Sequence, residues 1–185
     1  MFGGTFARDA ALALAAADRV LVVRGWRTPR SPGDTLERVT VTVQPGTLPL
    51  HTISGNRAIT GIRAQVELPA PPEDRRALRE LALSIRWDGE QWPSVWSPLG
   101  DFFGAAPGVC FYRTLPLGVT DGGLYCHWFM PFAQSAELAI SNDGDVPHTL
   151  SLNICHRPLE RDAAELLHFH AKWHRDAFVE RSASE

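Results

Sequence analysis

The sequence lacks the features that mark several common classes of enzyme and membrane protein. None of its hydrophobic runs approaches the roughly 18 residues that a membrane span needs. It has no glycine-rich phosphate loop ending in lysine, no dinucleotide-binding fingerprint and no serine in a nucleophile-elbow context. Nucleotide-dependent enzymes and α/β-hydrolases are therefore disfavoured, and we predict no cofactor and no membrane partner.

Signs of secretion are also missing. The three cysteines, Cys110, Cys126 and Cys155, are an odd number with no close pair, so neither a disulfide framework nor a zinc knuckle is predicted. We expect them to be small buried residues. Arg8 and Asp9 precede the short apolar stretch near the N-terminus, and no small-residue cleavage pattern follows it. The expectation is a soluble, cytoplasmic protein without a signal peptide.

An excess of positive charge is missing too. Lysine and arginine number 18 against 21 acidic residues, which gives a net charge of −3, and the arginines are scattered. Such a chain has no basic surface for a phosphate backbone, so nucleic acid is not a predicted partner. The 44% hydrophobic and 21% charged residues are typical of a folded globular protein. At 185 residues, one core is expected.

The sequence does contain many short segments with strand character. In residues 38–43, valine alternates strictly with polar residues, which predicts a half-buried strand. Turn-forming segments separate further candidate strands at residues 19–26, 58–68, 81–87, 94–96, 123–129, 136–141 and 148–155. An alanine-rich stretch, residues 5–19, could form a short N-terminal helix. This pattern predicts an all-β sandwich or barrel, whose strand edges subunit contacts could protect.

Three histidines near the C-terminus have a metal-like spacing. In a helix, His170 and His174 would share a face; in a strand, His168 and Lys172 would join them, with Phe169, Ala171 and Trp173 opposite. The alternation of aromatic and polar residues favours the strand. A lysine within the row also argues against a cation site, so no metal is predicted.

Carboxylates and tryptophans are concentrated around residues 80–104. Cleavage of a glycosidic bond needs two carboxyl groups separated by roughly 5 to 9.5 Å. The candidates here are Glu80, Asp88, Glu90 and Asp101. Tryptophan faces stack on sugar rings, and the nearby ones are Trp87, Trp92, Trp96 and Trp128. The alternative is structural, because Asp88-Gly89 is typical of a tight hairpin turn and tryptophans in a sandwich usually lie in the core.

Several blocks of the sequence resemble a known family in their order and spacing. They are WDGEQWPSVWSPLGDFFG, LPLGV, GGLYCHWFMPFAQSAELAISNDGDVP and FHAKWHRD, at residues 87–104, 115–119, 122–147 and 169–176. They are similar to the first half of glycoside hydrolase family 172, the α-D-fructofuranosidase and difructose-anhydride enzymes first catalogued as a domain of unknown function. The resemblance covers roughly residues 39–176. It implies a single jelly-roll domain with an N-terminal segment and first strand (1–37), a core (38–176) and a tail (177–185).

The resemblance also suggests where catalysis would occur. Members of the family typically carry two jelly rolls in tandem, form trimers and place two catalytic glutamates in the second jelly roll, within GEG, DGE and GTGTEDYF motifs. This chain is expected to end where that second half would begin. Aligning the halves on their shared DGE and PS elements without gaps places the catalytic positions at Glu80 and Asp101. With one gap, the second position falls on Gly100, which has no acid. Alternatively, Asp101 fixes a loop by accepting backbone hydrogen bonds.

Three functions remain open from the sequence. The first is a homo-oligomeric, carbohydrate-active protein that acts on fructose-type or arabinose-type furanosides at subunit interfaces. Its predicted substrate-binding residues are Trp87, Asp88, Glu90, Trp92, Trp128 and His170, and its enzymatic activity stays undecided. The second is a capsid-like structural protein that assembles as a trimer or as a hexameric ring. The third is a lectin-like module that binds a glycan without cleaving it.

Overall fold

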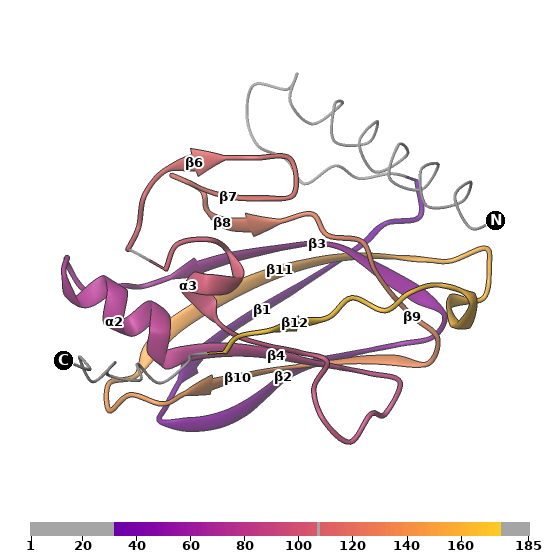
Figure 1. Cartoon of the computed structure of the whole chain (residues 1–185), viewed down its shortest axis with the longest axis horizontal. Helices are drawn as coiled ribbons and strands as arrows, with labels where there is room; N and C mark the ends of the chain where they lie inside the picture. The colour runs from indigo at the N-terminus through magenta and orange to yellow at the C-terminus, as the bar shows by residue number, and fades with distance from the viewer. Residues whose placement is uncertain (1–31, 107, 175–185) are drawn as a thin grey trace, which may run out of the picture.

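The computed structural model describes residues 32–106 and 108–174, which form two packed β-sheets (Figure 1). The seven-stranded sheet contains, in order, β1 (Thr35–Val43), β11 (His148–Pro158), β3 (Arg57–Val66), β8 (Gly123–Cys126), β7 (Leu117–Thr120) and β6 (Tyr112–Arg113), while β9 (Met130–Phe132) also pairs with β3. The five-stranded sheet contains β12 (Ala171–Lys172), β5 (Val95–Pro98), β4 (Leu81–Trp87), β10 (Ser135–Asn142) and β2 (Gly46–Ser54).

The strand pairs are nested along the chain. Strand β1 pairs with β11, β2 with β10, β3 with β8 and β9, and β4 with β5, all antiparallel. Successive pairs alternate between the two sheets, so the chain folds as one long hairpin rolled into a sandwich, which is the jelly-roll topology. The prediction of an all-β, jelly-roll sandwich is therefore confirmed.

The core lies between the sheets and follows the alternation of the strands. In β10, Ala136, Leu138 and Ile140 are buried at every second position, facing Leu83 and Ile85 of the same sheet and the inner face of the other. The prediction of buried cysteines is confirmed for Cys126 and Cys155. It is wrong for Cys110, which is exposed in the segment before β6. Burial raises the pKa of the Cys126 thiol to about 12, so that thiol is not activated.

Two short helices cover one end of the sandwich at the left of Figure 1. Helix α2 (Glu73–Glu80) begins after Pro72 with acidic residues in its first turn, where they favour the helix dipole, and α3 (Leu99–Phe102) follows β5 directly. Helix α2 was not predicted, because it directly follows the proline-rich segment at residues 69–72 between two candidate strands. Within the described ranges, no helix is long and apolar enough to cross a membrane.

Strand β2 was also missed, because Pro45 and Gly46 signal a turn and Pro49 interrupts the pattern. Proline is tolerated there because β2 is an edge strand, and its register against β10 shifts at the position of Pro49. The other strands expected from residue 38 to residue 155 are present, β4 with the predicted bounds. The predicted helix at residues 5–19 and strand at 19–26 lie outside the described residues.

Candidate functional site

Trp87 ends strand β4 and belongs to the core. Its side chain is fully buried, and its ring stacks on Phe132 with 6.0 Å between the centroids and 9° between the planes. Its indole Nε1 donates a hydrogen bond of 2.8 Å to the carbonyl oxygen of Phe169. No ring face is open to a ligand, so Trp87 does not provide the sugar-stacking surface that we predicted for it.

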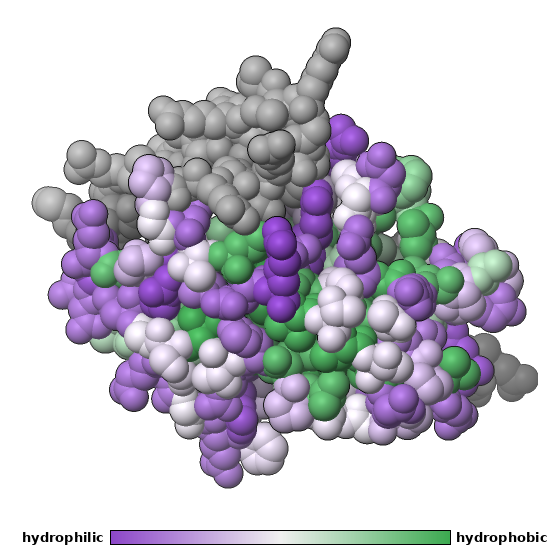
Figure 2. Space-filling view, turned by 180° about the vertical axis from the view of Figure 1, so that it is seen from behind, coloured by the Kyte–Doolittle hydropathy of each residue, from purple (hydrophilic) through white to green (hydrophobic). Residues whose placement is uncertain are grey.

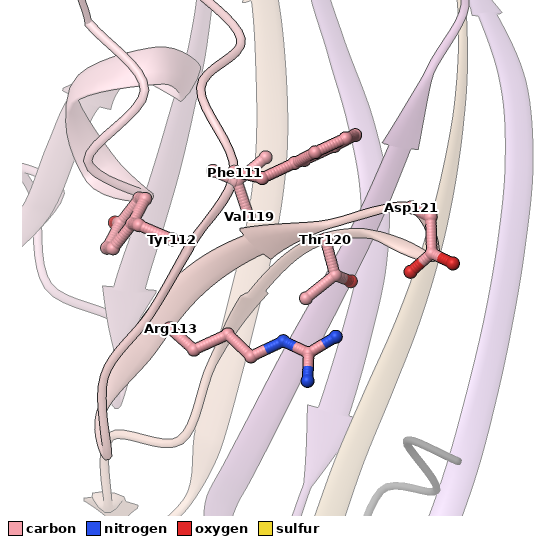
Figure 3. A pocket seen from close by; sticks show the side chains of 6 residues that line it. All are labelled: Phe111, Tyr112, Arg113, Val119, Thr120 and Asp121. Atoms are coloured by element: carbon pink, nitrogen blue, oxygen red, sulfur yellow. The ribbon is translucent and has the colours of Figure 1, made fainter.

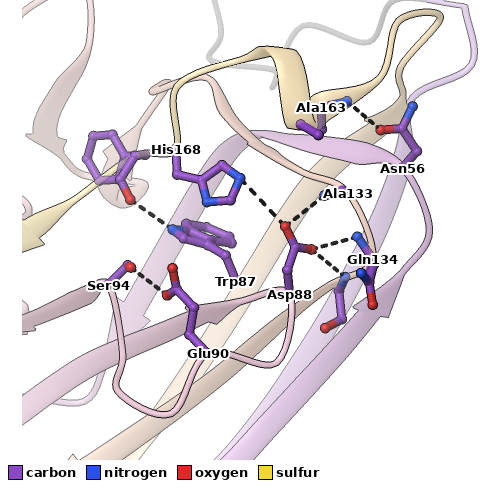
Figure 4. A network of polar contacts seen from close by, with 12 residues as sticks. Asn56, Trp87, Asp88, Glu90, Ser94, Ala133, Gln134, Ala163 and His168 are labelled. Atoms are coloured by element: carbon purple, nitrogen blue, oxygen red, sulfur yellow. Dashed lines mark hydrogen bonds and ion pairs between the residues drawn. The ribbon is translucent and has the colours of Figure 1, made fainter.

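Asp88 anchors the loop that follows β4 (Figure 4). Asp88 and Gly89 both have positive φ, 52° and 74°, and the amide of Glu90 donates to the carbonyl of Trp87, as in a type I′ turn. The Asp88 carboxylate accepts bonds of 2.6, 3.0 and 3.1 Å from the amides of Gln134, Ser135 and Ala133. It therefore joins this turn to the β9–β10 connection.

The electrostatics of Asp88 agree with a structural role. Burial alone would raise the pKa of its carboxyl, but the three backbone N–H donors, with a smaller contribution from His168, lower that pKa below its ordinary value. The Nε2 atom of His168 lies 3.6 Å from Oδ2 of Asp88. Asp88 is held as a charged acceptor, and its oxygens are occupied by these donors rather than directed at a ligand.

The rest of this loop projects outward. Ser94 donates a hydrogen bond of 2.5 Å to Glu90, closing the loop against the start of β5 (Figure 4). Between these residues, Trp92 is 73% exposed. Trp92 is therefore the predicted residue of this loop that presents a large apolar side chain to solvent. Asp88 and Glu90 hold the two ends of the loop in place.

Further aromatic residues are exposed on the β8–β9 connection. Trp128 is 37% exposed and Phe129 45%, and the ring of Trp128 lies 5.9 Å from that of Phe169. His170, one residue further along the chain from Phe169, is exposed. Trp128 and His170 are thus both accessible, as their predicted roles require.

The two predicted catalytic carboxylates are bound by different arginines. Glu80 forms an ion pair with Arg76, one turn earlier on α2. The Oδ2 atom of Asp101 lies 2.8 Å from Nε of Arg79. Successive residues of a helix diverge by about 100°, so Arg79 and Glu80 leave α2 in different directions. Glu80 and Asp101 thus have different charged partners on the same helix.

Asp101 is the centre of a cluster that the sequence analysis did not foresee. Besides its ion pair with Arg79, it accepts a hydrogen bond of 3.1 Å from Nε1 of Trp173. The Arg79 guanidinium lies 5.4 Å from the Trp173 ring centroid, and that ring lies 6.3 Å from Trp96. One prediction was that Asp101 fixes a loop by accepting backbone hydrogen bonds. Its carboxylate instead contacts two side chains, Arg79 on α2 and Trp173 just after β12.

The histidine row is mostly irregular, with only Ala171–Lys172 forming a strand, β12, parallel to β5. The predicted alternation holds from Phe169 onward, where Phe169 and Trp173 are half-buried while His170 and His174 are exposed, but His168 is half-buried as well. The Lys172 ammonium donates to the carbonyl of Pro93. Among the described residues, no group of three or more histidine, cysteine or acidic side chains could hold a metal ion.

Two cavities have linings that include none of these residues. One, of about 460 Å³, is lined by Phe111, Tyr112, Arg113, Val119, Thr120 and Asp121 along β6 and β7 (Figure 3). The other, of about 330 Å³, is lined by residues of β1, β2, β3 and β11. Among the described lining residues, each cavity has one carboxylate, Asp121 in the first and Glu37 in the second. Neither contains any of the residues predicted from the sequence.

Comparison with known proteins places the chain in a family. No curated protein matches it. Among solved structures, it is similar to a chain of the acidic stable capsid of Helicobacter pylori bacteriophage KHP30, with 9% identity, 67% of this chain and 86% of that chain covered, and a TM-score of 0.39. A TM-score this low does not establish a shared fold. The GH172 domain-like family model, by contrast, matches residues 33–154, well over half of the chain. The chain therefore belongs to the GH172 domain-like family.

Proposed function

We propose that this chain is a homo-oligomeric, carbohydrate-binding member of its family. The observation that carries the proposal is the exposure of Trp92, 73%, on a loop whose base Asp88 holds by three backbone hydrogen bonds. A large apolar ring on a rigid support can stack on a sugar with little loss of conformational freedom. Trp128 and His170 extend the proposed binding surface on the neighbouring segments.

The geometry favours binding over hydrolysis. Hydrolysis by the usual route needs two carboxyl groups on either side of one bond. Glu80 and Asp101 are each engaged by an arginine, and each described cavity carries one carboxylate. Catalysis on a furanoside by either Glu80 or Asp101 would therefore require a second subunit to bring another acid into the site.

A titration of the full chain with furanosides tests the binding surface. The panel contains aryl α-furanosides and oligosaccharides of fructose or arabinose, and isothermal titration calorimetry measures their binding. We expect at least one of them to bind, and its affinity to fall about tenfold in Trp92→Ala, the loss expected when ring stacking is removed. Leu167→Ala is the matched control, since Leu167 is 78% exposed but is not aromatic. The proposal fails if no member of the panel binds, or if both variants weaken binding equally.

Self-association is supported by the two long edge strands. Within the described residues, β1 pairs only with β11 and β2 only with β10, each over most of its nine residues. Val41, Leu48 and Leu50 on these strands pack against the core but stay partly exposed. The reverse side of the molecule shows hydrophobic residues gathered at its centre, with hydrophilic ones around them (Figure 2). Such edges are usually covered, and a second copy is the proposed cover.

Light scattering at micromolar concentration tests the assembly. We expect a trimer or hexamer that Leu48→Glu dissociates, while Arg161→Glu, at an exposed position after β11 and on neither edge strand, leaves it intact. A monomeric wild-type chain would refute the assembly. If the oligomer forms but no glycan binds, the capsid-like structural role, which the same edge strands support, replaces the carbohydrate-binding proposal.

A further inference from the structure

A second polar cluster lies at the edge strands β1 and β2. Its charged and imidazole groups come from four strands: Glu37 on β1, His51 on β2, Arg57 on β3 and His156 on β11. They line the cavity of about 330 Å³ together with Thr35, Thr52, Ile53 and Ser54. The cavity thus joins both sheets of the sandwich.

Arg57 determines which nitrogen of His156 carries the proton. Its Nε atom donates a hydrogen bond of 2.8 Å to Nδ1 of His156, and a guanidinium has no acceptor, so Nδ1 must offer its lone pair. Burial, reinforced by the charge of Arg57, lowers the pKa of His156, which keeps the ring neutral. The neutral ring then carries its proton on Nε2 and presents an N–H donor toward Glu37.

This donor has an incomplete environment. His156 is 4% exposed, and its Nε2 lies 3.6 Å from Oε1 of Glu37, beyond an ordinary N–H···O distance. No acceptor among the described residues lies within hydrogen-bonding distance of Nε2. The other oxygen of Glu37 lies 4.0 Å from Nε2 of His51. The long contact with Glu37 leaves this buried donor poorly paired, which is costly, and an oxygen atom of a ligand lying beside the two groups would hydrogen-bond with both.

The charge of the lining indicates what kind of molecule supplies that oxygen. The negative charge of the Glu37 carboxylate and the positive charge of the Arg57 guanidinium cancel. A phosphate would be repelled by the carboxylate, and an amine would be repelled by the guanidinium. The remaining polar groups are imidazoles and the hydroxyls of Thr35, Thr52 and Ser54, which both donate and accept. This lining suits a neutral ligand with several hydroxyl groups.

We propose that this cavity binds a neutral polyhydroxylated small molecule, a monosaccharide or a polyol, with Glu37 as acceptor and the Nε2–H of His156 as donor. The ligand would bridge strands of both sheets. The inference rests on the cavity alone and does not depend on glycan binding at Trp92.

Calorimetry with the full chain tests the ligand class. The panel contains neutral fructose, arabinose, glucose and mannitol, with gluconate as the anionic probe and glucosamine as the cationic one. We expect saturable binding of at least one neutral compound at millimolar concentration, and at least about fivefold weaker binding of the charged probes, because either charge meets a like charge in the lining.

Variants locate the site. Glu37→Gln keeps the shape but weakens the acceptor, so affinity should fall about tenfold, whereas Glu67→Gln, an exposed acid just beyond β3, should leave it unchanged. Ser54→Leu, at an exposed position of the lining, should abolish binding by filling the cavity, and it gives an independent check if Glu37→Gln folds poorly.

Three results would overturn the inference. The first is no binding by any neutral compound, which would mean that only water fills the gap. The second is equal or tighter binding of a charged probe. The third is binding that survives both Glu37→Gln and Ser54→Leu but is lost in Trp92→Ala, which would place the sugar on the exposed loop and support the proposed function instead.

Discussion

Two carboxylates of this molecule face a histidine at the same distance, yet their surroundings differ. Oδ2 of Asp88 and Oε1 of Glu37 each lie 3.6 Å from an imidazole Nε2, of His168 and His156 respectively. Asp88 also accepts three backbone hydrogen bonds, whereas none reaches Glu37 within the described part of the chain. The backbone donors, rather than the imidazole distance, distinguish a carboxylate that holds the fold from one that a ligand can use.

The largest expected effect follows directly from this difference. Asp88→Asn keeps a residue that tolerates the positive φ of 52° but cannot satisfy three amide donors as a charged acceptor, so the free energy of unfolding should fall by about 2 kcal/mol. Glu37→Gln should change it by less than about 0.5 kcal/mol. Urea denaturation of both variants checks the contrast. Equal losses would show that the backbone donors do not separate the two carboxylates.

Two tryptophans show how far the sequence determined the candidate site. The strand ending at Trp87 was predicted with its bounds, and the alternation of the sheet buries that ring completely. Trp92, five residues later in the same motif, is 73% exposed, because it lies in the loop beyond the turn at Asp88. The predicted strand already put Trp87 on the same face as Leu83 and Ile85, and Trp92 beyond its end. The sugar-stacking role was assigned to both rings from their shared motif, which does not distinguish a core residue from a surface one.

The cluster at Glu37 was invisible for a different reason. Glu37 and His156 are far apart along the chain, and only the pairing of β1 with β11 brings them together, with Glu37 opposite Ile154. Neither residue belongs to a local motif, so no spacing rule could connect them. The jelly-roll topology could be predicted because it repeats local strand and turn signals, whereas this cluster depends on register between distant strands.

The second prediction uses acid to weaken the Asp88 centre. Because the folded pKa of Asp88 lies below its unfolded value, about 4, the carboxylate contributes stability above that pH, and the contribution is lost as pH falls through the folded pKa. The stability difference between wild type and Asp88→Asn should therefore be constant near neutral pH and shrink below about pH 4. Urea midpoints across that range measure it. A difference that stays constant down to the acid limit would contradict the assigned role of the charge.

The smallest expected effect concerns the proton on His156. Arg57→Met removes a neighbouring positive charge and the donor to Nδ1, while burial and the Glu37 carboxylate stay, so the pKa of His156 should rise. An NMR titration of the ring proton on Cε1 measures the shift, with Arg38→Met, an exposed position on β1, as the control. If Arg57→Met leaves the pKa unchanged, Arg57 does not fix the ring. A rise in the pKa of His156 in Arg57→Met, but not in Arg38→Met, would mean that Arg57 on β3 fixes the His156 ring. The Nε2–H donor that faces Glu37 would then be positioned by β3, as the backbone amides position Asp88.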